Sequence, residues 1–144
     1  MELSKAVRSA YYTALDGQIT FDSNVVPVFD AYAVPDDVKY PYILLSSQTS
    51  TQLTIKRCKR YNASILIDIV TGSTDLIGRE YTEDIAEQID SIINPDTFED
   101  IDLSEYGYQL GNTTRDGDND LTDKNGLYYI YRKLLTYNFL IIKI

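Results

Sequence analysis

The spacing of hydrophobic residues predicts two amphipathic helices. Apolar side chains recur every three or four residues in residues 2–16, as on one face of a helix, and Gly17 follows as a helix end. The same period recurs in residues 79–93, and Asn94 with Pro95 ends that helix. The predicted apolar stripes are Leu3, Val7, Ala10, Tyr11 and Ala14 in the first helix and Tyr81, Ile85, Ile89, Ile92 and Ile93 in the second.

β-forming residues predict strands in the remaining hydrophobic segments. In residues 61–71 apolar side chains point to both faces, which is typical of a strand at the centre of a sheet. A short alternating set, Tyr106, Tyr108 and Leu110, predicts a further strand. The other predicted strands are Ile19–Phe21, Val25–Phe29, Tyr40–Ser47 and a long closing strand Leu127–Ile144.

Three polar segments separate these elements. Gln48–Lys59 is polar and then basic, and we interpret it as a hairpin or a long loop. Asp96–Ser104 is predicted as an acidic linker, and Thr113–Gly126 as a loop because it is dense in Asp, Asn and Gly. With 144 residues, the chain fits one domain, residues 1–144. The predicted fold class is α+β, with a mostly antiparallel sheet packed against two helices.

The composition removes several functional classes. The chain has 22 acidic and 13 basic residues, a net charge of −9, which argues against a dedicated nucleic-acid-binding protein. It has no histidine, the commonest general base and transition-metal ligand. It has 13 tyrosines, a residue type that is enriched both in protein interfaces and in half-buried strands.

The aspartates at the end of the predicted loop resemble a calcium-binding loop at first sight. Asp116, Asp118, Asp120 and Asp123 alternate with other residues. An EF-hand, however, needs Gly at its sixth position and Glu at its twelfth, where this chain has Leu121 and Leu127. We therefore interpret the segment as a solvated hairpin tip, while a looser cation site, and with it a metal-dependent hydrolase, stays an alternative.

No other residue set predicts catalysis. Asp68 lies in the middle of the central strand, where a basic partner is the simplest expectation for a buried carboxylate. Cys58 lies among cations that lower a thiol pKa, but there is no histidine to act as its base. Phosphate-binding glycine motifs are absent from the sequence. We therefore expect no enzyme, no cofactor and no bound metal.

Four basic residues form a dense cluster and are the candidate interface residues. In an acidic chain, a single basic segment can meet the acidic surface of another copy, and such a head-to-tail contact closes into a ring. A solvated loop between strands is the alternative interpretation. The cluster consists of Lys56, Arg57, Lys59 and Arg60.

The chain shows neither a signal-peptide pattern at its start nor an apolar run of the roughly 20 residues that span a bilayer. We therefore expect synthesis in a reducing cytoplasm and no membrane partner.

Several segments together resemble a known family of structural proteins. The resemblance covers most of residues 1–93 and is carried above all by the strand that begins Tyr40-Pro41-Tyr42 after a short Pro-Asp loop. Further parts are the helix that begins Met1–Arg8, the segment Val28-Phe29-Asp30, the long strand Ala63–Ile69, and Gly78-Arg79-Glu80 before the second helix. The pattern resembles the tail-terminator, or tail-completion, proteins of tailed bacteriophages.

This resemblance implies a structural role. It implies a subunit of a homo-oligomeric ring of six or twelve copies at the neck or tail of a virion, made in the cytoplasm of a bacterial host. Double-stranded DNA would pass through the lumen without sequence-specific binding, and the ring would contact portal, neck or tail proteins. On this hypothesis residues 48–60 and 113–126 are the contact regions. The alternative is a small adaptor that binds one host or phage protein through a tyrosine-rich surface.

Overall fold

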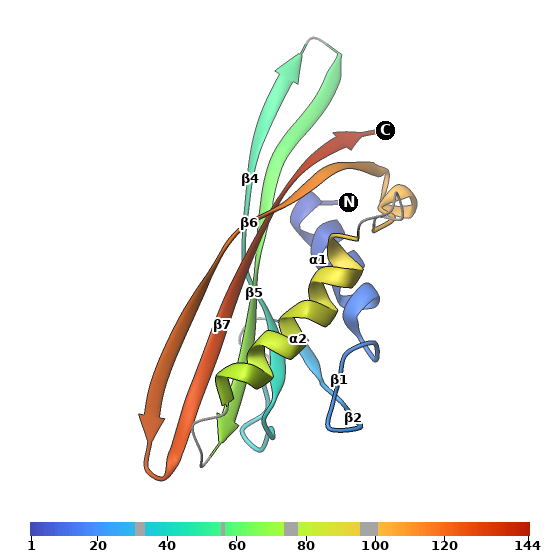
Figure 1. The fold of residues 1–144 in the computed structure, drawn as a ribbon. Helices are drawn as coiled ribbons and strands as arrows, with labels where there is room; N and C mark the ends of the chain where they lie inside the picture. Colours follow the sequence, from blue (N-terminus) through green and yellow to red (C-terminus); the bar gives the residue numbers. More distant parts are fainter. Residues whose placement is uncertain (31–33, 56, 74–77, 96–100) are drawn as a thin grey trace.

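The computed structural model describes residues 1–30, 34–55, 57–73, 78–95 and 101–144. A five-stranded sheet in the order β3-β4-β5-β7-β6 forms one layer. Its strands are β3 (Val28–Asp30), β4 (Tyr42–Ile55), β5 (Cys58–Ser73), β7 (Tyr128–Lys143) and β6 (Tyr108–Asn125). All strand pairs are antiparallel except β3 with β4. The strands are long and curved, so the sheet extends well beyond the helices in Figure 1.

Two helices form the second layer and lie on the same side of the sheet (Figure 1). They are α1 (Leu3–Leu15) and α2 (Gly78–Ile93), and α2 contacts β5 and β7. A small hairpin of β1 (Thr20–Phe21) and β2 (Asn24–Val25) follows α1, and a short 3₁₀ turn (Ser104–Tyr106) precedes β6. These bounds, and the central position of β5, confirm the predicted α+β fold class and both predicted helices.

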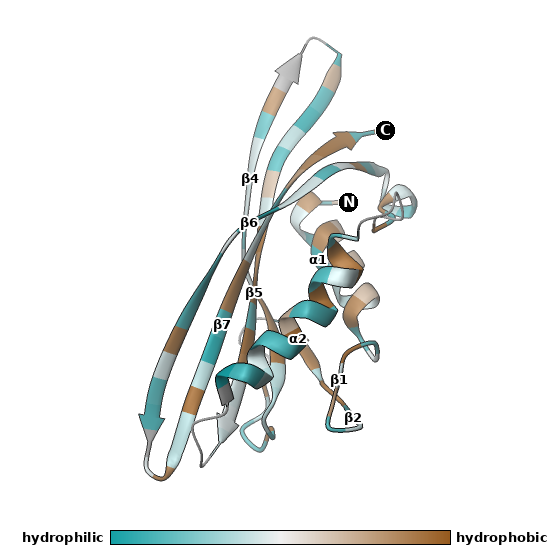
Figure 2. Ribbon diagram, viewed as in Figure 1, coloured by the Kyte–Doolittle hydropathy of each residue, from teal (hydrophilic) through white to brown (hydrophobic). Residues whose placement is uncertain are grey.

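The hydrophobic core lies between the helices and the sheet. Ile65, Ile67 and Ile69 of β5 point into it and are fully buried, because every second side chain of a strand faces the same side. The apolar stripes of the helices cover them, and Figure 2 shows the outward face of α2 as mostly hydrophilic. The fully buried partners include Ala6, Leu15, Ile85, Ile89, Ile93, Leu135, Tyr137 and Ile141.

The described part of residues 48–59, predicted as a hairpin or a long loop, forms a hairpin, whereas residues 113–126, predicted as a loop, are mostly β-structure, which corrects the sequence analysis. Residues 48–55 belong to β4 and residues 58–60 to β5, and Leu53 pairs with Arg60 across the hairpin. Residues 113–125 belong to β6, which pairs with β7 from Tyr108 to Asn125. The turn-forming composition of residues 113–126 is that of a charged edge strand with two bulges, not of a loop.

Two smaller differences concern the same region. Tyr106 lies in the 3₁₀ turn, so the strand predicted to begin there begins at Tyr108. The turn ends at Gly107, whose backbone is left-handed, a conformation that glycine adopts without strain. Most of the predicted acidic linker, residues 96–100, lies outside the described residues.

Candidate subunit interface

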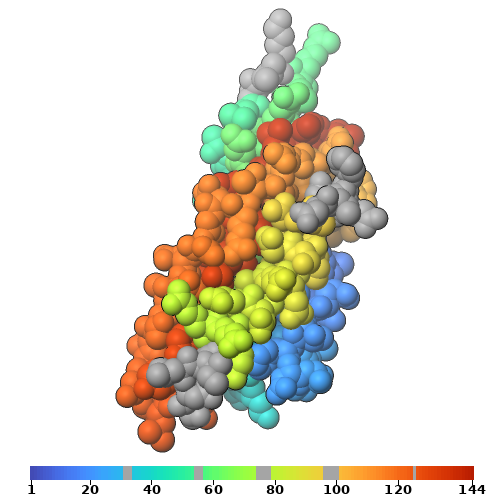
Figure 3. All heavy atoms as spheres, viewed as in Figure 1, coloured from blue at the N-terminus to red at the C-terminus, as the bar shows by residue number. Residues whose placement is uncertain are grey.

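The end of the β4–β5 hairpin projects from the body of the molecule and carries the basic cluster. β7 accompanies β5 only as far as the pair of Arg60 with Ile142, so the hairpin beyond this row is paired only with itself. Figure 3 shows it standing clear of the rest of the surface. We call residues 49–60 the basic arm.

Three of the four predicted interface residues lie in described parts of this arm; Lys56 lies outside the described residues. Arg57 and Lys59 are exposed, and Arg60 is half-buried. Among the described residues none of these three cations forms an ion pair, and the buried Nε of Arg60 has no hydrogen-bond partner. The arm therefore presents uncompensated positive charge.

The charge of the chain is strongly segregated. Residues 42–67 contain four of the 13 basic residues and no acidic residue. The other nine basic residues and all 22 acidic residues leave the rest of the chain with a net charge of −13. This pattern is suited to a head-to-tail contact between copies, because the positive arm of one copy is attracted to the negative body of another.

A network of ion pairs joins β6 and β7 to α2 and accounts for two of the aspartates. The Nζ atom of Lys133, nearly buried, lies 3.1 Å from Asp118 and 3.3 Å from Asp120. Arg115 binds Asp118 at 2.9 Å and approaches Asp90 of α2 at 4.0 Å. Hydrogen bonding to Lys133 and its positive charge lower the pKa of Asp118. These carboxylates are held by cations of the chain itself.

In the described parts of the chain, no group of three His, Cys, Asp or Glu side chains is arranged to hold a metal ion. The described helices include none that is long and apolar enough to cross a membrane. Cys58, at the start of β5, is partly exposed and is not in a disulfide.

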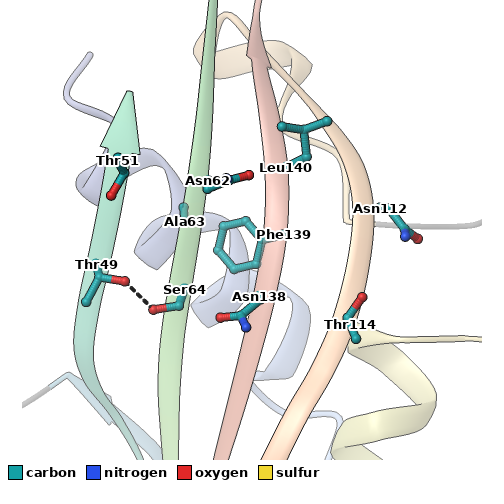
Figure 4. A pocket seen from close by; sticks show the side chains of 10 residues that line it. All are labelled: Thr49, Thr51, Asn62, Ala63, Ser64, Asn112, Thr114, Asn138, Phe139 and Leu140. Atoms are coloured by element: carbon teal, nitrogen blue, oxygen red, sulfur yellow. Dashed lines mark hydrogen bonds between the residues drawn. The ribbon is translucent and has the colours of Figure 1, made fainter. Parts of the chain in front are cut away.

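The face of the sheet opposite the helices, which we call the open face, carries the side chains of the long strands that do not point into the core. A shallow groove of about 480 Å³ runs across its middle. Figure 4 shows the groove spanning all four long strands, with the hydrogen bond between Thr49 and Ser64 at one side. Its lining residues are Thr49, Thr51, Asn62, Ala63, Ser64, Asn112, Thr114, Asn138, Phe139 and Leu140. None of these lining side chains is charged.

A second groove of about 430 Å³ on the same sheet contains Tyr40, Tyr42 and Arg132. Arg132 forms an ion pair with Asp68, whose side chain is 2% exposed. This confirms the basic partner expected for Asp68. The hydrogen bond to Asp68 raises the pKa of Arg132.

The described tyrosines are divided between the core and the surface. Tyr11, Tyr108, Tyr131 and Tyr137 are buried, whereas Tyr12, Tyr40 and Tyr128 are among the exposed hydrophobic side chains. The buried ones have structural roles. The hydroxyl of Tyr108, for example, donates a hydrogen bond to the backbone of Met1 at 2.8 Å.

Tyr137 gives a testable pH dependence. Its side chain is fully buried, and its hydroxyl donates to Asp90 at 2.8 Å. Burial, and then the hydrogen bond to Asp90, raises its pKa above the value of about 10 that tyrosine has in an unfolded chain. The stabilising contribution of the neutral phenol is thus complete below about pH 10 and is lost as the pH rises further, by about 1.4 kcal/mol per pH unit.

We expect Tyr137→Phe to cost about 1 kcal/mol at pH 7, where a hydrogen bond is lost. Above about pH 10 the cost should shrink and reverse, because phenylalanine cannot ionise. Urea denaturation from pH 7 to pH 11 measures this difference directly. Tyr12→Phe, at an exposed position, is the matched control. Equal alkaline slopes in wild type and Tyr137→Phe would contradict the expectation.

Comparison with known proteins adds one finding. No protein-family model and no curated protein sequence matches the chain. Among solved structures, a chain from the virion of a native gene transfer agent particle has a similar fold, with a TM-score of 0.66 and 12% sequence identity. The match covers 96% of this chain and 97% of the other chain. At this identity the likeness shows a shared fold that includes nearly all of both chains.

Proposed function

We propose that this protein is a structural subunit of a ring at the neck or tail of a phage-like particle, as a tail terminator or head–tail connector. The observation that carries the proposal is the projecting basic arm on an otherwise acidic molecule. Such a surface joins identical copies head to tail, and repetition of one heterologous contact closes into a ring. The fold shared with a protein of a gene transfer agent virion supports a place in such a particle.

The ring would consist of six or twelve copies around the DNA channel and would join portal-proximal components to tail components. A net charge of −9 lets duplex DNA pass without tight binding, since phosphates are repelled by an acidic surface. Two features suited to subunit assembly, a groove across the open face and long strand edges, are present on the sheet. The protein would be made in the cytoplasm of the bacterial host and retained in the virion.

The mass of the particle in solution tests this proposal. We expect light scattering on a size-exclusion column to give six or twelve times the chain mass of 16.4 kDa at high protein concentration. The mass should fall towards one chain as salt screens the contacts between the arm and the acidic body. A monomer at every concentration, bound one-to-one to a single partner in pull-down, would contradict the ring and support the adaptor alternative.

A further inference from the structure

The outer edge of β4 is open along the basic arm. β3 pairs with β4 only at residues 43–45, and no described strand lies beside β4 on that side beyond Leu45. An open strand edge presents backbone N–H and C=O groups that are ready to pair with another strand.

The direction of these backbone groups follows from the pairing of β3 with the start of β4. The N–H of Ile43 points toward β3, because it donates to the carbonyl of Pro27 at 2.9 Å, and its side chain lies in the core. Side-chain face and backbone direction alternate together along a strand. Ser50 also faces the helix side, since it pairs with Ala63 of β5, whose side chain lies in the core. Its N–H therefore points to the open edge and not to β5.

Beyond a bulge between Leu45 and Gln48, this edge carries neither charge nor proline. Residues 46–53 contain only Ser, Thr, Gln and Leu, without proline or charge. Natural proteins normally place charges, prolines or bulges on an exposed edge to prevent association. The opposite edge of the sheet, β6, carries four aspartates, two basic residues and two bulges, which disfavour its pairing with another acidic edge but not with an uncharged edge beside a basic cluster. An open, uncharged edge that leads into a projecting arm is a site for strand addition.

We infer that the open edge of β4 in the basic arm pairs with β6 of a second copy, so that the sheet continues from subunit to subunit. This inference rests on the proposed ring. The strands alternate in direction across β4, β5, β7 and β6, so β4 runs antiparallel to β6. Copies related by rotation about an axis along the strands therefore meet through an antiparallel ladder. The two edges lie on opposite sides of one sheet, which is the arrangement that a closed ring requires.

The charges fit this pairing. Leu53, Arg60, Ile142 and Gln109 lie in one row across the sheet. If neighbouring copies are level, the basic end of one arm lies beside the segment that leads into β6 of the next copy. The described acidic side chains there are Asp102 and Glu105, both exposed. The arm thus brings positive charge to an acidic segment of its neighbour.

Disulfide formation between introduced cysteines tests the pairing. In a Cys58→Ser background, Thr51→Cys on β4 is combined with Asn112→Cys or with Thr114→Cys on β6; all three positions are exposed and line the open-face groove. Within one copy, β4 and β6 are separated by β5 and β7, a span of about 14 Å that a disulfide cannot bridge. Any bond formed on mild oxidation therefore joins two copies.

We expect a ladder of covalent oligomers for at least one pair, ending at the ring size. The control combines Thr51→Cys with Asn119→Cys, which lies about 15 Å beyond Thr114 along β6. This variant should remain monomeric on a denaturing gel. A ring that forms by light scattering and gives no ladder with either pair would overturn the strand pairing and leave the proposed function intact. A protein that is monomeric at every concentration would overturn both.

Ser50→Pro provides a second test. Proline removes one N–H from the open edge without removing a bond to β5. We expect this variant to lose the ring, while Ser50→Ala keeps it and both retain the wild-type circular dichroism spectrum. A Ser50→Pro ring as stable as that of wild type would contradict the inference.

Discussion

Reversal of the two exposed charges of the basic arm, Arg57→Glu with Lys59→Glu, is expected to weaken ring assembly at least about tenfold, or about 1.4 kcal/mol per contact. The reason is electrostatic. Both cations lack an ion-pair partner among the described residues, so their contribution to the folding of one copy is small. In the ring, the two introduced glutamates would face the acidic body of the neighbour, and like charges repel. Light scattering over a range of protein concentrations measures the change.

A matched control separates local charge from total charge. Lys5→Glu with Lys39→Glu changes the net charge by the same amount at two exposed positions outside the basic arm and outside β6. These residues lie outside the proposed contact, so this variant should assemble nearly as wild type does. Equal weakening in both double variants would show that only net charge matters. Unchanged assembly of Arg57→Glu with Lys59→Glu would contradict a role for the arm.

Salt provides an internal check on the same prediction. At about 1 M salt the screening length falls to about 3 Å, so the wild-type ring should lose most of the advantage that its arm charges provide. The difference between wild type and the arm variant should therefore shrink with salt. Backbone pairing along the edge of β4 is not screened in this way, so a residual tendency to associate should remain in both proteins.

Much of the fold could be predicted because local patterns dominate it. Both helices follow from apolar stripes with a 3.6-residue period, and α2 begins at Gly78, within one residue of the predicted start. The central position of β5 follows from its two apolar faces. Such features depend on neighbours in the sequence, which a single chain displays directly.

The hairpin of β6 and β7 was harder to predict, because the structure of β6 is set by its pairing with β7 and not by its own composition. Residues 113–125 contain turn-forming Asp, Asn and Gly, yet β7 provides a full antiparallel ladder for them, and Lys133 compensates Asp118 and Asp120. Tertiary pairing overrides local propensity in an edge strand. The cluster of Arg57, Lys59 and Arg60 was visible in the sequence, whereas the open edge beside it depends on the strand order.

The largest effect on stability is expected from Arg132→Met. Asp68 is almost fully buried on the open face, and Arg132 is its ion-pair partner. Removal of the cation leaves a buried carboxylate without its counter-charge. The free energy of unfolding should fall by about 3 kcal/mol. This value is at the lower end of the range for breaking a buried ion pair, because the Arg132 side chain is itself 44% exposed. For a chain of this size that lowers Tm by roughly 10 °C.

Two further variants identify the cause. Arg8→Met makes the same substitution in the exposed pair of Arg8 with Asp30, 3.2 Å apart, and should cost under about 1 kcal/mol. Asp68→Leu combined with Arg132→Met removes both charges and should recover most of the lost stability, because no unpaired charge remains in the sheet. Urea denaturation of the four proteins measures these differences. A cost for Arg132→Met no larger than that for Arg8→Met would mean that water reaches Asp68, and that the pair orients Arg132 in its groove more than it stabilises the sheet.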